Sequence, residues 1–300
     1  MHRSGQHDES DTPHRQRRLL AAVALNLLIT IAEVIGGLLS GSIALLSDAL
    51  HNFGDTASLG TSYFAITYSK KGANLSKTFG YKRIEVIAAF FNLVVLALIS
   101  LFLIKEAVER AADPQPIRGG LMFAVASVGL AANIATALLL HRDARDSVNV
   151  RSAYLHIVTD AISSVGVVIA GVLVWAYDIV LIDPLLTIAI SAFILYQVYH
   201  LLRDTTNILM NSVPPDVDVE SVVAEMEGIA LVRDVHHVHV WSMDEHQAAL
   251  EAHVVIDEEV APQMDRIRTD IKLMLESRFG ISHSTLEIEF ERCESPEDCL

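Results

Sequence analysis

The sequence predicts an α-helical membrane protein with six transmembrane helices, followed by a cytoplasmic α+β domain. Three observations lead to this fold class. Of the 300 residues, 52% are hydrophobic, and the mean hydropathy of +0.39 is too high for an ordinary soluble domain. Six apolar runs each have about the length of a membrane-spanning helix. All of the excess negative charge lies beyond the last of these runs.

The six runs are the expected spans, each near the ~20 residues that a spanning helix needs. They cover residues 19–39, 43–68, 86–104, 119–140, 157–177 and 184–202. The tail before them, 1–18, and the loops on its side of the membrane hold 13 Lys and Arg residues, whereas the opposite side holds only Lys105, Arg110 and Arg118. This bias predicts that both termini lie in the cytoplasm.

The last 89 residues form a separate acidic domain. Residues 212–300 hold 6 Lys and Arg residues against 21 Asp and Glu residues, while residues 1–211 hold 16 of each. Such acidity argues against a nucleic-acid partner. Pro214 and Pro215 cannot continue a helix, so we place the boundary between the membrane domain (19–211) and the cytoplasmic domain (212–300) beside them.

The cytoplasmic domain has an α-β-β-α-β pattern. A helix is expected near 217–226, strands at 235–243 and 248–256, and a last strand at 285–290. The second helix carries apolar residues at helical spacing, namely Met264, Ile267, Ile271 and Leu275. This order of elements predicts a small two-layer domain.

Two histidine–aspartate pairs lie inside apolar segments. His51 and Asp55 are four residues apart in the second run, and His156 and Asp160 repeat this spacing in the fifth. Residues four apart share one face of a helix. At about 1.5 Å per residue, His51 lies ~12 Å from the start of its run and Asp160 lies ~14 Å past Arg151. Because the two helices run in opposite directions, both pairs reach a similar depth.

Two imidazoles and two carboxylates suit a tetrahedral Zn²⁺ site. The two carboxylates cancel the charge of the ion in a medium that penalises net charge. Since a coordinating histidine must be neutral, metal and protons compete for such a site. The pairs therefore predict exchange of a divalent metal for protons across the membrane.

Other interpretations of these polar residues stay open. Asp48 shares the ligand face only loosely, so an access path or a helix contact competes with metal ligation there. Asn26, Glu33 and Asn133 favour interhelical hydrogen bonding, with a proton path as the alternative. An intramembrane metalloenzyme would leave an open coordination position and is disfavoured by the absence of an H-E-x-x-H motif. A passive cation channel would favour rings of weak sites over one tight cage.

The motifs resemble those of the cation diffusion facilitator family. The resemblance rests on "SDALHNFGD" (47–55), "FGYKRIE" (79–85), "YLHIVTDAISSVGVV" (154–168), "VHHVHVW" (235–241) and the double proline at the domain boundary. It extends from about Arg18 to Glu291 and is strongest with zinc, cobalt and cadmium exporters of bacteria. It implies a homodimer in the bacterial inner membrane that exports divalent metal in exchange for protons, with a metallochaperone-like (ferredoxin-like) cytoplasmic domain and no prosthetic group.

The sequence departs from the family pattern at two points. Some members have Asp where His51 stands, and the His version resembles the more zinc-restricted group. The histidine-rich loop between the fourth and fifth spans is absent, because this segment holds only His141.

Metal binding in the cytoplasmic domain is a further expectation from the resemblance. In related proteins, histidines at the positions of His236, His239, His253 and His283, together with C-terminal cysteines such as Cys293 and Cys299, bind metal between subunits. A solvated surface with scattered histidines is the alternative. Strand periodicity predicts that His237 and His239 share one face and that His236 points to the other.

Overall fold

The structure is a computed structural model that describes residues 12–69, 73–141, 148–244 and 247–292. Within its helices, the side chains of residues 12–22, 55, 58–69, 148–153 and 156 are not described. The chain divides into two compact units. We call residues 1–61 and 91–200 the bundle unit, and residues 62–90 and 201–300 the sheet unit.

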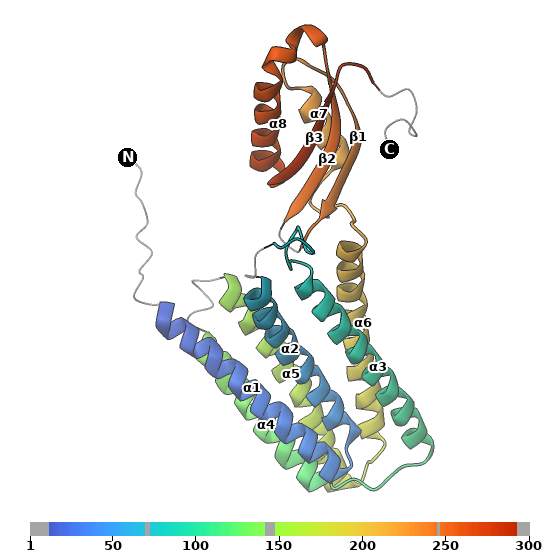
Figure 1. Cartoon of the computed structure of the whole chain (residues 1–300). Helices are drawn as coiled ribbons and strands as arrows, with labels where there is room; N and C mark the ends of the chain where they lie inside the picture. Colours follow the sequence, from blue (N-terminus) through green and yellow to red (C-terminus); the bar gives the residue numbers. More distant parts are fainter. Residues whose placement is uncertain (1–11, 70–72, 142–147, 245–246, 293–300) are drawn as a thin grey trace. The chain divides into compact units, whose positions relative to one another are not determined.

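Six long helices match the six expected spans (Figure 1). They are α1 (Thr12–Ser40), α2 (Ile43–Ser69), α3 (Ile84–Ala112), α4 (Gly119–Leu140), α5 (Val148–Tyr177) and α6 (Ile182–Leu209). Five of them, α1 and α3 to α6, are long and apolar enough to cross a membrane. The chain is therefore an integral membrane protein. The spanning role of α2, many of whose side chains are not described, stays a prediction.

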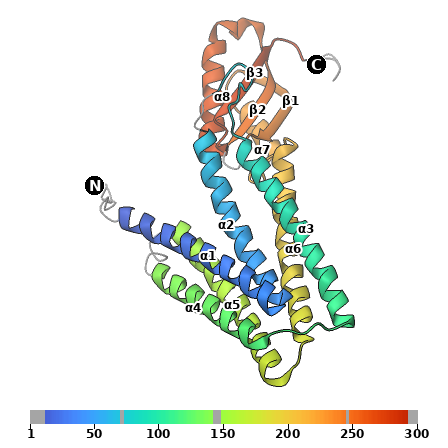
Figure 2. The same ribbon diagram turned by 60° about the horizontal axis from the view of Figure 1, so that its bottom comes forward.

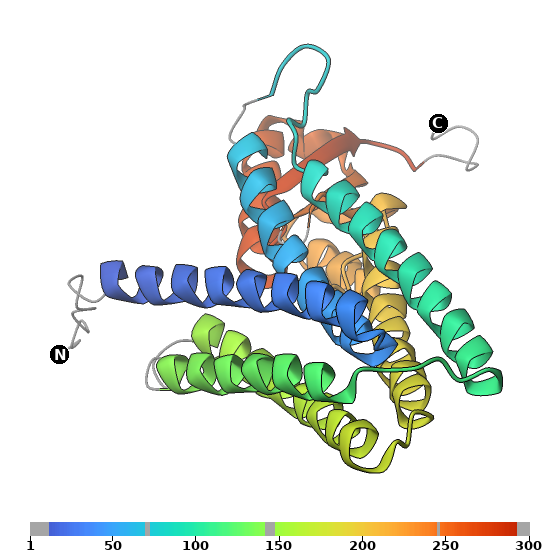
Figure 3. The same cartoon turned by 90° about the horizontal axis from the view of Figure 1, so that it is seen from below.

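Close helix packing organises the bundle unit. Figures 2 and 3 show α4 lying beside both α1 and α5, and these two pairs make extensive contact. Gly171 on α5 explains the close approach to α4, since a Cβ there would lie only 2.9 Å from the Phe123 backbone nitrogen. Small residues allow membrane helices to approach in this way. The paired histidines and aspartates lie on α2 and α5 within this unit.

The sheet unit confirms the expected α-β-β-α-β order. Its elements are α7 (Val219–Glu227), β1 (Val232–Ser242), β2 (Ala248–Ile256), the short 3₁₀ helix η2 (Glu258–Gln263), α8 (Met264–Phe279) and β3 (His283–Glu289). The sheet order is β1-β2-β3, with β1 antiparallel and β3 parallel to β2. The parallel pair requires the crossover that α8 supplies.

One face of this sheet forms the core of the domain. Alternate residues of β2, from Ala248 to Ile256, are buried with Val222 of α7 and Ile271 of α8. Asp218 begins α7 by accepting a hydrogen bond from the Ser221 backbone nitrogen at 3.2 Å, as an N-cap should. The Ser221 hydroxyl also donates to this carboxylate and holds the pKa of Asp218 below its usual value. The other sheet face carries polar side chains such as Glu251 and His253 of β2, together with the buried Ala249 and Val255.

Candidate metal centre

The site in the bundle unit is centred on a contact between α2 and α5. His51 Nε2 lies 3.3 Å from Asp160 Oδ1, and the two side chains are 6% and 2% exposed. The imidazole of His51 also packs edge-on against Phe193 of α6, with ring centroids 6.3 Å apart. One residue of each predicted pair is therefore brought together in a site shielded from solvent.

The other two predicted ligands belong to the same helices. Asp55 is one turn beyond His51 on α2, and His156 is one turn before Asp160 on α5. Their side chains lie outside the described residues. The four-residue ligand set therefore remains a prediction from sequence, and the structure describes the contact between one member of each pair.

Asp48 makes a helix contact. Its carboxylate accepts hydrogen bonds from the hydroxyls of Ser163, at 2.7 Å, and Ser164, at 3.2 Å, on α5. Ser164 also accepts a bond from Asn133 Nδ2 on α4 at 3.2 Å. Both carboxylate oxygens of Asp48 thus have hydroxyl partners, which favours the helix-contact interpretation. The serine pair was not singled out in the sequence, although its adjacency in "ISSVG" was visible.

A second polar network ties α1 to α2 directly beside His51. Asn52 Nδ2 donates to Glu33 Oε2 at 2.8 Å, and Asn26 Nδ2 donates to Thr56 Oγ1 at 3.1 Å. Glu33 is only 1% exposed. These bonds, with that of Asn133, agree with the interhelical role expected for Asn26, Glu33 and Asn133. Asn52 was missed because a neutral amide next to a histidine carries no signal by itself.

Asp183 fastens the beginning of α2 to α6. This fully buried residue accepts hydrogen bonds from Ser42 Oγ at 2.5 Å, from the Ile43 nitrogen at 3.0 Å and from the Ala44 nitrogen at 3.2 Å. It therefore satisfies the free N–H groups of the first turn of α2 from a different helix. Sequence reasoning missed it, because a contact across 140 residues leaves no local pattern.

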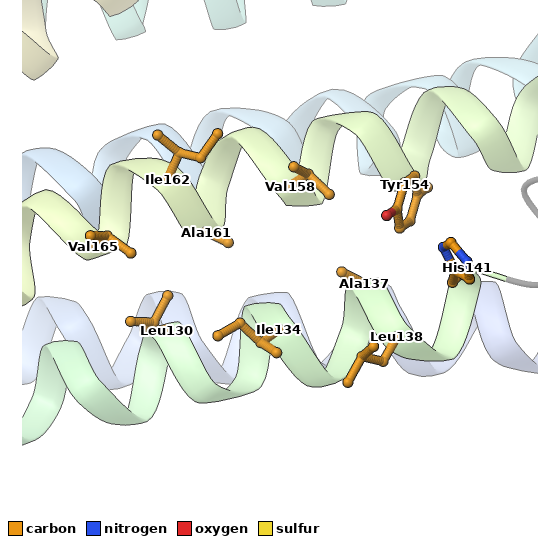
Figure 4. Close-up of a pocket in the computed structure, with 10 residues that line it drawn as sticks. All are labelled: Leu130, Ile134, Ala137, Leu138, His141, Tyr154, Val158, Ala161, Ile162 and Val165. Atoms are coloured by element: carbon orange, nitrogen blue, oxygen red, sulfur yellow. The ribbon is translucent and has the colours of Figure 1, made fainter.

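An apolar groove of about 290 Å³ lies between α4 and α5 (Figure 4). Its walls carry aliphatic side chains such as Ile134 and Ile162, and the rings of His141 and Tyr154 meet at one end with centroids 5.5 Å apart. A groove with one imidazole offers too few ligands for a cation. It is distinct from the His51–Asp160 contact.

The open face of the sheet carries a second group of candidate ligands. His236, His253 and Glu289 offer ligand atoms that all lie within 4.8 Å of one another. His253 Nδ1 is 2.6 Å from Glu289 Oε1, and His236 Nε2 is 3.3 Å from Glu289 Oε2. All three residues are partly buried. Two imidazoles and a carboxylate at this spacing suit Zn²⁺, with a further ligand completing the tetrahedron.

A β-bulge in β1 corrects one part of the predicted strand faces. The pairing with β2 shifts between His236 and His239, and His237 has a φ of 49°, in the left-handed region. The extra residue lets Val235 and Val238 both pack in the core, so His236 lies on the same face as His239, and the expectation that His236 points to the other face is wrong. The ring of His237 lies beside those of His239 and His253, with centroids 4.7 and 4.9 Å apart, which agrees with the expected neighbourhood of His237 and His239.

The remaining cytoplasmic candidates are placed elsewhere or are not described. His239 is exposed, and the exposed His283 packs against Phe79 with ring centroids 5.8 Å apart. Cys293 and Cys299 lie outside the described residues. Glu289 was missed as a ligand, although the alternation in "TLEIEF" places it on the face opposite Ile288, which is partly buried against the core.

Two sequence families match most of the chain. Residues 19–210 match the family described as cation efflux transmembrane domain, and residues 214–291 match the cation efflux protein cytoplasmic domain. The first match includes both histidine–aspartate pairs, and the second includes the cluster on the sheet.

Curated relatives are similar over almost their whole length. The zinc transporter ZitB of Escherichia coli is 36% identical, covering 100% of this chain and 96% of the relative. A cadmium, cobalt and zinc/H⁺–K⁺ antiporter of Bacillus subtilis is 34% identical over 95% and 92%, and the metal cation efflux protein CzcD of Cupriavidus metallidurans is 34% identical over 97% and 92%. A solved metal-bound C-terminal domain of CzcD is 33% identical, covers 24% of this chain and 99% of that chain, and has a TM-score of 0.23.

Proposed function

Because the chain belongs to the cation efflux family of membrane transporters, we propose that it exports Zn²⁺ from the cytoplasm in exchange for protons. Its relatives are transporters and not enzymes, so chemistry on a substrate is not required of the site. The relatives' names include zinc, cadmium and cobalt, and we infer that Cd²⁺ and Co²⁺ are secondary substrates here.

The observation that carries the proposal is the contact of His51 with Asp160. It joins α2 to α5 through one member of each pair at a buried position. Adding Asp55 and His156 one turn away gives a His2Asp2 set, which neutralises a divalent cation. A channel would need weak sites that release the ion rapidly, whereas four convergent ligands favour a tightly held ion that is released by a conformational change.

Proton competition supplies the driving force in this proposal. Imidazole binds metal only when neutral, and in water it titrates near pH 6.5. A site that opens first to the cytoplasm loads Zn²⁺ on deprotonated histidines. After reorientation to the other side, protonation of His51 and His156 displaces the ion. The protonated site is electrically balanced by Asp55 and Asp160, so its return costs no net charge in the membrane.

The orientation and assembly follow from sequence and family. The excess of Lys and Arg on one side supports cytoplasmic termini, and we infer the bacterial inner membrane from the organisms of the relatives. The name of the cytoplasmic family, ZT_dimer, supports a homodimer. Within each cytoplasmic domain we infer a second Zn²⁺ site formed by His236, His253 and Glu289, which a zinc titration of the full chain tests.

Zinc flux into proteoliposomes tests the transport site. Asp160→Ala and His156→Ala should each abolish flux and the associated proton movement, because three remaining ligands bind zinc much more weakly than four. Thr136→Val is a matched control, since Thr136 is buried on α4 and bonds only within its own helix. Both ligand variants should remain folded and dimeric by size-exclusion chromatography. Flux near the wild-type rate in either would refute the assignment.

A further inference from the structure

A strongly basic segment leads into α3. Between residues 70 and 83 the chain carries five Lys and Arg residues and no Asp or Glu, in contrast to the acidic last 89 residues. We call residues 73–83 the basic loop. Since α3 is long and apolar enough to cross the membrane and begins at Ile84, the basic loop lies at a membrane surface.

The basic loop has a defined conformation. Asn74 closes it by accepting hydrogen bonds at its side-chain oxygen from the backbone nitrogens of Ser76 and Lys77, both at 2.9 Å. The Asn74 amide in turn donates to the Tyr81 hydroxyl at 3.1 Å. Gly80 has a φ of 75°, which glycine adopts without strain. The cations that follow are therefore presented by an ordered turn.

The loop lines a pocket of about 690 Å³ within the sheet unit. The pocket includes the cations Lys77, Lys82 and Arg83, and its walls are completed by the ring of Trp241 and the start of α3 at Ile84. None of the described residues that line it is acidic. The pocket thus combines three positive charges with aromatic and aliphatic surface.

Two of the cations are held in place without being neutralised. Lys82 Nζ donates to the side-chain oxygen of Gln247, and the Arg83 guanidinium donates to that of Asn211. Both acceptors are neutral amides. A neutral acceptor fixes the position of a cation but leaves its charge available to an anion. Lys77 is exposed beside them.

We propose that this pocket binds the phosphate headgroup of an anionic phospholipid, with the acyl chains running beside Ile84 and Ile87. Lysine and arginine are the usual partners of phosphate, clusters of them next to a membrane helix attract anionic lipid, and tryptophan and tyrosine favour the headgroup level. An excess of Lys and Arg on one side of the membrane would by itself be enough to set the orientation of the spanning helices, and it would need no pocket. Among the described residues no carboxylate lines this pocket, so we infer that its cations take an anionic ligand.

Native mass spectrometry of the full-length protein tests the proposal by measuring how much lipid stays bound. Phosphatidylglycerol and phosphatidylcholine are compared at equal concentration. We expect retained phosphatidylglycerol and little phosphatidylcholine. Replacing both lysines in Lys77→Gln/Lys82→Gln should weaken phosphatidylglycerol binding about 30-fold, following about fivefold per lysine near a membrane surface. The charge-preserving Lys77→Arg/Lys82→Arg should retain it.

A matched variant controls for total charge. Arg266→Gln/Lys272→Gln removes two positive charges from exposed positions on α8 and should leave lipid binding unchanged. Equal binding of both lipids, or an equal loss in this control, would overturn the proposal. So would displacement of the lipid by glycerol phosphate at matched concentration, because the pocket would then be a site for soluble phosphate. The test needs only the membrane insertion of α3, so its outcome is independent of the transport proposal.

Discussion

Glu33 is held between three helices by contacts at both of its carboxylate oxygens. Oε2 accepts the hydrogen bond from Asn52, and Oε1 lies where a Cβ on Gly129 of α4 would be only 2.5 Å away. A Cβ at position 129 would therefore push the end of the Glu33 side chain from its place beside Asn52, the neighbour of His51. Glycine at position 129 of α4 thus leaves the space that the Glu33 carboxylate of α1 occupies.

We expect Gly129→Ala to destabilise the protein by about 1–3 kcal/mol, the usual cost of overpacking, and to slow zinc flux. Gly166→Ala is the matched control, because a Cβ there meets Leu186 at an ordinary 3.5 Å and both changes gain the same helix propensity. Thermal unfolding in detergent measures the difference. Adding Glu33→Asp, which shortens the side chain, should restore part of the stability. Equal stability of the two alanine variants would contradict this account.

At the scale of single elements, the strands of the sheet unit determine the second metal site. β1 supplies His236, β2 supplies His253 and β3 supplies Glu289, all on the face that α7 and α8 leave open. The bulge at His237 brings His239 to the same face as the cluster, since without the extra residue Val238 and His239 would exchange faces. A local irregularity in one strand thus decides which histidines can act together.

Zinc titration of the full chain in an Asp160→Ala background isolates this second site. His253→Ala or Glu289→Gln should lower the zinc affinity of this site by at least about tenfold. Loss of a residue that only hydrogen-bonds to a metal ligand already lowers metal affinity by about tenfold or more, so loss of a ligand itself should cost at least as much. His239→Ala, an exposed neighbour on the same face, should leave the affinity unchanged. If all three variants bind zinc like their parent, the cluster is an ion-pair network and not a metal site.

The elements themselves were largely predictable from the sequence, and their irregularities were not. Long apolar runs and the spacing of Ile267, Ile271 and Leu275 report helices directly, because burial imposes their periodicity. The bulge depends on the backbone of His237 alone, and the cluster depends on pairing between β2 and β3. The partners Asn52 and Asp183 depend on tertiary contacts. Such features arise only when distant segments meet, so no window of sequence contains them.

At the scale of the whole molecule, proton exchange predicts a characteristic pH response. Zinc export should fall as cytoplasmic pH drops below about 6.5, since protonated imidazole cannot bind metal there. Acidifying the opposite side should instead speed turnover, because protons displace the ion. Both are measured as zinc flux in proteoliposomes with imposed gradients of either sign. Flux that ignores the gradient would show that zinc moves without proton exchange.

Asp183 gives α2 a fixed end, and this has a mechanical consequence. Three hydrogen bonds tie Ser42 and the first turn of α2 to α6, so we expect a tilt of α2 to pivot about that turn. His51 lies eight residues after the first residue of α2, so a tilt of roughly 10° would displace the imidazole by about 2 Å at ~1.5 Å per residue. Metal–ligand distances tolerate only about 0.2 Å. In the proposed transport cycle, we expect a small tilt of this kind to be enough to release the ion, without unfolding any part of the helix.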